Sequence, residues 1–277
     1  MIAAFVIQVV LALAAALAAP WVGRRGRGVW LTVLIAATVV MACWPLIRVF
    51  TPDAVALLGV RTVVCTELTA MIVPATLFFG IVAGKVPNKR DGRMLLVLSA
   101  AVGLYFVKAG AWMVWPAGGG VGEEARGGVG GTKIDGAGVC RQSTGYTCVA
   151  ASMVTLLQAR GVPADEAEMA RLSYTEIGGG ATDSRALLAL RTKLDAHQSA
   201  TGERLHAAYG RMDAAGLIAA AKPCLVQMDW GFFVSHMVPV MDADSERVII
   251  GDPLEGTRSV PMAEFVREWK GRAITVE

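Results

Sequence analysis

Three residues far apart in the chain have the side chains of a thiol nucleophile, a general base and an orienting acid. Cys148 stands in the first turn of a predicted helix at residues 148–160, where free backbone amides and the helix dipole favour a thiolate. His236 begins a predicted strand and Asp252 follows the next one, and antiparallel pairing of these strands would bring the two side chains together. An aspartate that orients an imidazole, which in turn activates a thiol, predicts nucleophilic attack on a carbonyl carbon.

Gln142, six residues before Cys148, is a fourth candidate. Its side-chain amide and the backbone N–H of Cys148 could both donate hydrogen bonds to a tetrahedral oxyanion. Structural interpretations also exist: most free cysteines are small buried residues, and His236 could be a histidine at the edge of the core. The four residues together favour catalysis, because an activated nucleophile needs this set of groups.

The motifs QSTGYTC, HMVPV and GDPLEG resemble those of the papain-like cysteine peptidases that process bacteriocin precursors. That family has Gln, five residues and Cys, then His before an apolar strand, then Asp-Pro; the tail MAEFVREWKGRAITV resembles its closing helix and strand. The resemblance covers residues 140–277 and implies a papain-like α+β domain. It implies Cys148 as nucleophile, His236 as general base, Asp252 as its orienting partner and Gln142 as oxyanion donor.

The same resemblance implies a peptide or precursor-protein substrate, cut after Gly-Gly in its leader, and an ABC exporter as partner. One departure concerns the nucleophile, where the family usually has Asp-Cys-Gly and this chain has Thr147, Cys148 and Val149. Val149 is expected to narrow the cleft near the thiol, which would change substrate preference or activity. The alternative function is therefore a catalytically silent peptidase-like module that binds leader peptides for a separate exporter.

Residues 140–277 read as helices first and an antiparallel sheet later, which is an α+β layout. The helix after the nucleophile helix is expected to place Asp165, Glu166 and Glu168 on its solvent face. Helices are predicted at 164–172, from 182 or 183 to about 194, at 212–221 and at 262–269, and strands at 205–209, 224–230, 236–241 and 247–251.

The first 115 residues are far more apolar than the rest, in a chain that is 55% hydrophobic and 18% charged. Four stretches there are long enough to cross a bilayer as helices, which takes roughly twenty residues each. The first could instead be a secretory signal, but no basic residue precedes its apolar run. The sequence therefore predicts an α-helical membrane region at residues 1–115, with spans at 2–22, 29–47, 68–84 and 94–115.

Basic residues in the loops predict the orientation of these spans. They cluster in residues 23–28 and 85–93, whereas the connector between the second and third spans holds only Arg48 and Arg61. Because basic loops stay in the cytoplasm, both termini should lie outside it. The chain is then an integral protein of a bacterial inner or plasma membrane with an extracytoplasmic peptidase domain. The exporter-linked relatives differ, since their peptidase domain is cytoplasmic.

A glycine-rich linker is expected at residues 116–139, between the two regions. No Gly-Lys-Ser/Thr follows its glycines, which argues against nucleotide binding, and a net charge of +3 gives no indication of a nucleic-acid partner. The five cysteines contain no CxxC pair, so neither a metal nor another cofactor is expected. Outside the cytoplasm, Cys140 and Cys224 could form a disulfide.

Overall fold

The computed structural model describes residues 129–175, 180–230 and 235–277, and before them only residues 21–22, 32–33, 35–36, 39, 77–78, 81–82 and 97. The chain forms two compact units, Met1–Pro116 and Ala117–Glu277. The four expected membrane spans and much of the expected linker lie almost entirely outside the described residues. Within the described residues, no helix is both long enough and apolar enough to cross a membrane.

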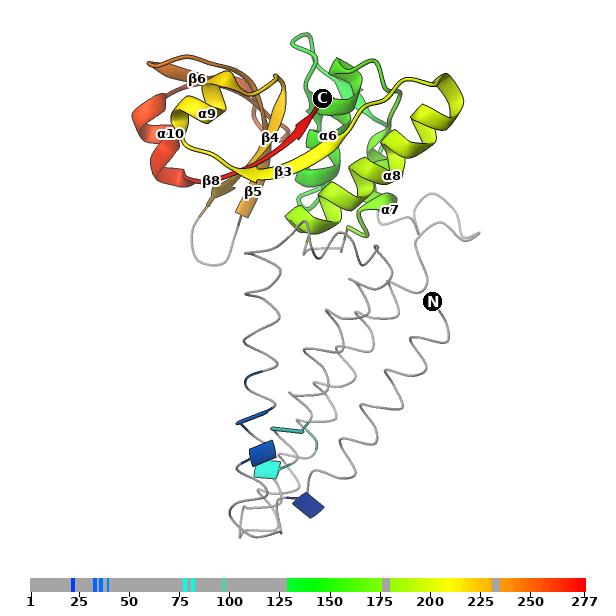
Figure 1. The fold of residues 1–277 in the computed structure, drawn as a ribbon, viewed down its shortest axis with the longest axis vertical. Coiled ribbons are helices and arrows are strands. Elements are labelled where there is room, and N and C mark those ends of the chain that lie inside the picture. Colours follow the sequence, from blue (N-terminus) through cyan, green and yellow to red (C-terminus); the bar gives the residue numbers. More distant parts are fainter. Residues whose placement is uncertain are drawn as a thin grey trace. The chain divides into compact units, whose positions relative to one another are not determined.

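The second unit is an α+β domain whose first three helices precede its main sheet, as predicted (Figure 1). Helices α6, α7 and α8 gather on one side in Figure 1, and the short helices α9 and α10 lie away from them. The elements are β1 (Lys133–Ile134), β2 (Cys140–Arg141), α6 (Cys148–Ala159), α7 (Glu166–Leu172), α8 (Asp183–Thr201), β3 (Ala207–Arg211), α9 (Ala214–Ala219), β4 (Cys224–Asp229), β5 (Ser235–Ala243), β6 (Arg247–Asp252), β7 (Gly256–Pro261), α10 (Met262–Glu268) and β8 (Trp269–Val276).

The main sheet has the strand order β3-β8-β4-β5-β6-β7, and its neighbouring strands are antiparallel. The predicted hairpin is formed by β5 and β6. Its turn is closed by Asp244, whose Oδ1 accepts hydrogen bonds from the N–H groups of Glu246 at 2.7 Å and Arg247 at 2.8 Å. The hairpin sets the start of β5 beside the end of β6, which brings His236 and Asp252 together.

Helix α6 is a central element of the domain. All of its residues from Val149 to Leu157 are buried, because it packs against β5, α7, α8 and β4. The predicted helix is confirmed to within one residue, and it ends just before Gly161, whose φ of 73° is a left-handed conformation suited to glycine. Cys148 is thereby held at the N-terminus of an element that is packed on several sides.

Some elements differ from their expected bounds or exposure. Helix α8 continues past Leu194 to Thr201 and ends at Gly202, whose φ is 80°; its last turns are polar, so no apolar period marked them in the sequence. Helix α9 is shorter than predicted. Glu166, expected on the solvent face of α7, is instead fully buried, because its carboxylate bonds to the backbone of the loop before α6.

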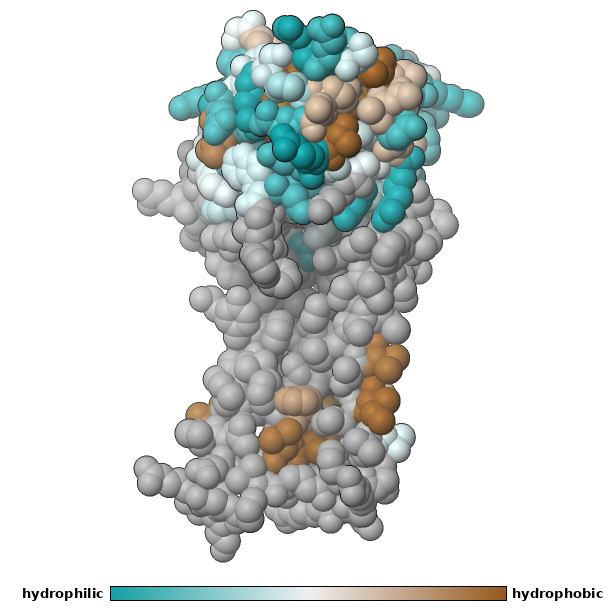
Figure 2. Space-filling model, turned by 90° about the vertical axis from the view of Figure 1, so that its left-hand side faces the viewer, coloured by the Kyte–Doolittle hydropathy of each residue, from teal (hydrophilic) through white to brown (hydrophobic). Residues whose placement is uncertain are grey.

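An apolar core lies between the sheet and helices α9 and α10. Gly251 in β6 lets the backbone of this strand lie close to Val139, since a Cβ at position 251 would lie 2.6 Å from Cγ2 of Val139. The face of the domain seen in Figure 2 is mostly hydrophilic, with separate small apolar spots. The core consists of Leu217, Cys224, Val226, Met228, Val238, Val240, Val248, Ile250, Val260, Met262, Phe265, Trp269 and Ala273.

Candidate active site

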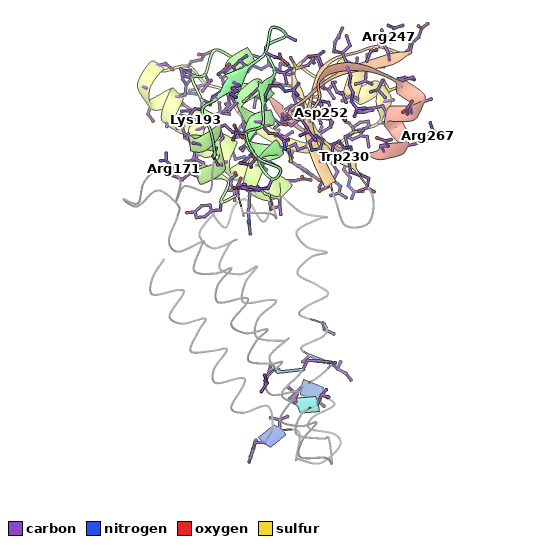
Figure 3. All side chains as sticks on the ribbon, turned by 180° about the vertical axis from the view of Figure 1, so that it is seen from behind. Arg171, Lys193, Trp230, Arg247, Asp252 and Arg267 are labelled. Atoms are coloured by element: carbon purple, nitrogen blue, oxygen red, sulfur yellow. The ribbon has the colours of Figure 1, made fainter. Side chains whose placement is uncertain are left out.

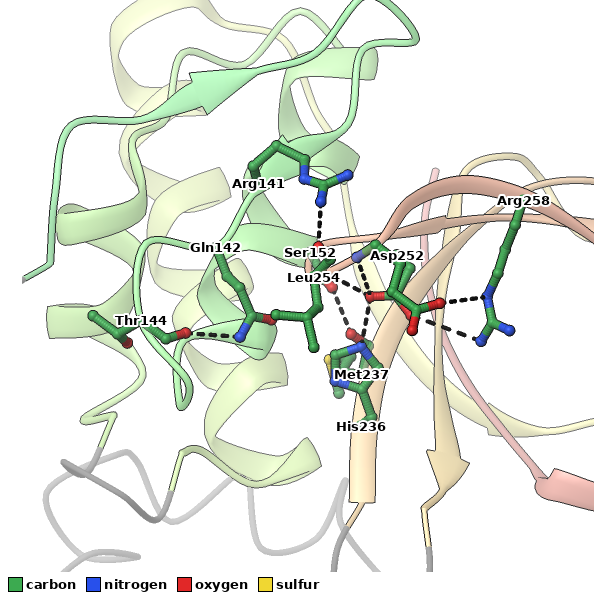
Figure 4. A network of polar contacts seen from close by, with 10 residues as sticks. Arg141, Gln142, Thr144, Ser152, His236, Met237, Asp252, Leu254 and Arg258 are labelled. Carbon is green, nitrogen blue, oxygen red and sulfur yellow. Dashed lines mark hydrogen bonds and ion pairs between the residues drawn. The ribbon is translucent and has the colours of Figure 1, made fainter.

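His236 and Asp252 form a buried, hydrogen-bonded pair (Figure 4). The Nε2 atom of His236 lies 2.9 Å from Oδ1 of Asp252, and the same oxygen accepts from the N–H groups of Leu254 at 2.8 Å and Glu255 at 3.3 Å. Burial alone would raise the pKa of Asp252, but the bonds from His236 and from these backbone amides lower it. Asp252 is therefore a carboxylate that fixes the imidazole in one orientation.

Arg258 in β7 approaches the second oxygen of Asp252. Its Nη2 lies 3.7 Å from Oδ2, which has no hydrogen-bond partner among the described residues. The Nε atom of Arg258 also lies 3.7 Å from Oε2 of the exposed Glu255. The guanidinium, with its side chain 40% exposed, thus supplies a partly solvated positive charge beside the buried carboxylate.

The thiol of Cys148 is hydrogen-bonded to the ring of His236 and to the backbone N–H of Met237. Because Nε2 of the ring binds Asp252, Nδ1 is the nitrogen left for the sulfur. Burial would raise the pKa of Cys148, but the bonds from His236 and Met237 and the charge on His236 lower it below its ordinary value. Cys148 is half-buried, so its sulfur is not sealed inside the core.

The imidazole of His236 responds in the opposite direction. Burial would lower its pKa, but the hydrogen bonds to Asp252 and Cys148 raise the pKa to about 9. The raised pKa of His236 and the lowered pKa of Cys148 both favour a thiolate–imidazolium pair over the neutral pair. The two groups titrate as a coupled pair, with each charge stabilising the other.

Two further side chains support this pair, and neither was predicted from the sequence. The indole of Trp230, which is labelled in Figure 3, stacks on the His236 ring, with centroids 4.0 Å apart and an angle of 24° between the planes. Ser152, one turn after Cys148, donates from Oγ to the carbonyl of Met237 at 2.8 Å and ties α6 to β5. Ser152 could have been noticed in the sequence, because it is a serine within an apolar helix. The stacking of Trp230 on His236 could not, because it depends on how β4 and β5 pair.

Gln142 lies in the loop between β2 and α6, and its amide faces its own loop. Nε2 donates to the carbonyl of Thr144 at 2.7 Å, and its backbone N–H donates to the carbonyl of Pro253 at 3.0 Å, beside Asp252. The structure therefore brings three of the four predicted residues into direct contact. It holds Gln142 in the neighbouring loop, where its side chain donates one hydrogen bond, to the Thr144 carbonyl, and Oε1 has no partner among the described residues.

The residues that flank Cys148 both point inward. The Thr147 hydroxyl lies 3.0 Å from Oγ1 of Thr144 and 3.3 Å from its backbone nitrogen, which braces the turn before α6. Val149 is only 3% exposed, so its side chain packs in the core. Its expected effect on the width of the cleft stays a prediction.

Cys140 and Cys224 are free thiols in buried positions, so the suggested disulfide is not formed. Burial, together with the charge of Glu166, raises the pKa of Cys140 to about 12. Burial also raises the pKa of Cys224 to about 11, despite nearby Lys222 and Arg160. Of the cysteines in the described domain, Cys148 is the one whose pKa is lowered. The described part of the chain holds no group of three His, Cys, Asp or Glu side chains suited to a metal ion.

The lowered pKa of Cys148 predicts fast alkylation of the full chain by iodoacetamide at neutral pH, about 10-fold faster than an ordinary thiol. The rate should stay high as the pH falls below the ordinary value of 9.0 and drop only below the lowered pKa. In His236→Ala the rate at neutral pH should fall and the titration should move to higher pH. Mass spectrometry of the labelled peptides measures this, with Cys140 and Cys224 as internal controls. A titration unchanged by His236→Ala would contradict the ion pair.

Comparison with known proteins adds a family match. The model of the peptidase C39 family matches residues 137–277. An uncharacterized protein of Methanothermobacter marburgensis is 27% identical over 139 residues, which are 50% of this chain and 87% of that protein. A solved double glycine motif protease from an AMS/PCAT transporter, in complex with the leader peptide, has a TM-score of 0.42 at 22% identity and covers 53% of this chain and 93% of its own. The peptidase domain of Streptococcus ComA, a bi-functional ABC transporter involved in quorum sensing, has a TM-score of 0.43 at 20% identity over 49% and 94%.

Proposed function

The chain belongs to the peptidase C39 family, and we propose that it is an active cysteine peptidase with Cys148 as its nucleophile. The observation that carries the proposal is the continuous line of contacts from the Cys148 sulfur through the His236 ring to the Asp252 carboxylate. Opposite pKa shifts along this line favour a thiolate before any substrate binds. A buried histidine kept for structure alone would not need a half-buried thiol as its second partner.

In the proposed reaction, the thiolate of Cys148 attacks the carbonyl carbon of the scissile peptide bond. The imidazolium of His236 then gives its proton to the leaving amine as the C–N bond breaks, which leaves an acyl-enzyme on the sulfur. His236, now neutral, takes a proton from water, and the resulting hydroxide releases the acid and regenerates the thiolate–imidazolium pair. Asp252 holds the ring and stabilises its positive charge throughout.

The developing oxyanion needs hydrogen-bond donors, and the loop before α6 can supply them. The backbone N–H of Cys148 is one candidate, since it belongs to the first turn of α6. Gln142 is the other: its amide nitrogen carries two hydrogens, and the bond to the Thr144 carbonyl uses one of them. The Thr144 bond would therefore fix the amide while the second hydrogen remains available for the oxyanion.

We propose peptides with a Gly-Gly leader as the substrate class, on the basis of the motifs shared with the precursor-processing peptidases. The apolar residues 1–115 support membrane anchoring through four spans, with the Gly-rich residues before β1 as the linker, since β1 pairs with β2 inside the domain. The basic loops support an extracytoplasmic peptidase domain. An ABC exporter is the proposed partner.

Cleavage of matched quenched-fluorescence peptides by the purified full chain tests this function. A peptide with Gly-Gly before the scissile bond should be cleaved, and its Leu-Leu counterpart should be cleaved roughly 100-fold more slowly if the site excludes larger side chains. Equal cleavage of both peptides would reject the Gly-Gly preference but keep the peptidase. If neither peptide is cleaved, and no member of a peptide library is cleaved, the peptidase function is rejected. The silent leader-binding module would then be the remaining function.

A further inference from the structure

Glu166 is a fully buried carboxylate that the proposed mechanism does not use. It is the first residue of α7, after the N-cap Asp165. Its Oε1 accepts a hydrogen bond from the backbone N–H of Ser143 at 2.9 Å, and its own N–H donates to Oγ1 of Thr132 at 2.8 Å. A buried carboxyl group is costly to leave without hydrogen bonds, and the bond from the Ser143 N–H satisfies Oε1, whereas Oε2 has no partner in the part of the chain that the structure describes.

The partner of this carboxylate lies in the loop that carries the proposed oxyanion donors. Ser143 directly follows Gln142, and we call residues 142–147, between β2 and α6, the oxyanion loop. Ser143 is held from two sides, since its Oγ also accepts from the N–H of Gly130 at 2.9 Å. The loop has a second anchor at Gln142 itself, whose backbone N–H donates to the carbonyl of Pro253, the residue after Asp252.

Removal of the Glu166 acceptor would therefore remove one of the hydrogen bonds that anchor this loop. The Ser143 N–H would lose its partner, and the backbone on the C-terminal side of Gln142 would be free to rotate toward another acceptor. The Gln142 amide would move with it, while the contacts of Cys148 with His236 and Met237 come from other elements and would remain. A misplacement of about 1 Å at a catalytic group can cost about 100-fold in rate.

We propose that Glu166 is a positioning residue, which aligns the oxyanion loop through the Ser143 backbone. This role rests on the proposed peptidase function, because it concerns a group that stabilises the transition state. It acts on the oxyanion side of the reaction only. It should therefore affect the rate of peptide cleavage without affecting the formation of the thiolate.

The test compares variants of the full chain by two readouts, kcat on the Gly-Gly peptide and the rate of Cys148 alkylation by iodoacetamide. Alkylation needs the thiolate but no oxyanion donor. Glu166→Leu should lower kcat by about 10- to 100-fold and leave the alkylation rate unchanged. Glu166→Gln keeps an oxygen for Ser143 and should stay within about 3-fold of the wild type. Inhibition by a Gly-Gly peptide aldehyde, whose adduct carries the oxyanion, should weaken in parallel with kcat.

Two more variants make the test robust. Glu166→Asp is the milder change if the leucine variant fails to fold, because it keeps the carboxyl group but draws it back by one methylene; its kcat should also fall. Glu168→Gln is the matched control, because Glu168 lies on the same helix and pairs at 2.7 Å with Lys193. It should cleave at the wild-type rate.

The outcomes separate this inference from the function on which it rests. Wild-type kcat in both Glu166→Leu and Glu166→Asp would overturn the positioning role while the peptidase stands. A fall in kcat matched by an equal fall in alkylation would also overturn it, because Glu166 would then support the fold or the thiolate in general. If the wild type itself cleaves no peptide, the proposed function fails and the positioning role fails with it.

Discussion

Replacement of Cys148 by alanine is expected to abolish peptide cleavage, with a fall in kcat of at least about 10⁴-fold. The sulfur forms the covalent bond in the proposed reaction, and among the described residues the other contacts of the His236 ring are Asp252 and the Trp230 indole, neither of which could replace the thiol. The fold should survive, because Cys148 is half-buried at a helix terminus and its thiol crosslinks nothing. Hydrolysis of the Gly-Gly peptide, with circular dichroism as the check on folding, measures the effect.

The matched control is Cys224→Ala, which removes a buried thiol from the opposite end of β4. Cys224 pairs with Val240, whereas Met228, at the other end, pairs with His236. The control should lose some stability through its small cavity, about 1 kcal/mol, but keep its kcat. Cleavage that persists in Cys148→Ala at more than a few per cent of the wild-type rate would eliminate the thiol mechanism.

Replacement of Asp252 by alanine should produce the second largest effect, a fall in kcat/KM of about 10³- to 10⁴-fold. Its Oδ1 accepts three hydrogen bonds, from His236, Leu254 and Glu255. Loss of the carboxylate leaves the imidazole without the partner that fixes its orientation and stabilises its positive charge. The turn after β6 also loses its acceptor, so stability should be measured alongside activity.

Asp252→Asn separates orientation from charge. The amide oxygen can still accept the bonds made by Oδ1, so kcat should fall only about 10-fold. Asp252 raises the pKa of His236, which stands at about 9; without the negative charge, this pKa must fall. His236 would then lose its proton at lower pH, and the alkaline limb of the kcat/KM profile should move to lower pH.

Asp242→Asn is the matched control for this pair, because it changes an exposed carboxylate of the same hairpin. It should leave both the rate and the pH profile unchanged. An alkaline limb that stays in place in Asp252→Asn would show that Asp252 does not set the charge on His236, and the proposed role of the carboxylate would then be wrong.

Local patterns were enough to predict most of the domain. The apolar run of α6 with Gly161 after it, and the two strands around Asp244, are set by neighbours in the chain, so their bounds were confirmed within a few residues. The same patterns put Cys148, His236 and Asp252 at the ends of elements. Pairing of the strands then required the last two to meet. The sequence also led to the family, because the spacing of the motifs can be read without knowing how the elements pack.

Other features followed only from how distant elements meet. The Glu166 side chain turned inward although its helix reads as solvent-facing, because its partner is a backbone amide more than twenty residues earlier. Trp230 reached the His236 ring through the register of β4 and β5, and Ser152 found the Met237 carbonyl on a strand far along the chain.

The sequence alone therefore determined which groups could react and which elements carry them. The tertiary structure decided which face each group presents, how strongly burial and neighbouring charges shift its pKa, and which buried side chains hold the site. The physical reason is that a residue's type and spacing are local properties, whereas its desolvation and its hydrogen-bond partners are created only when elements pack together.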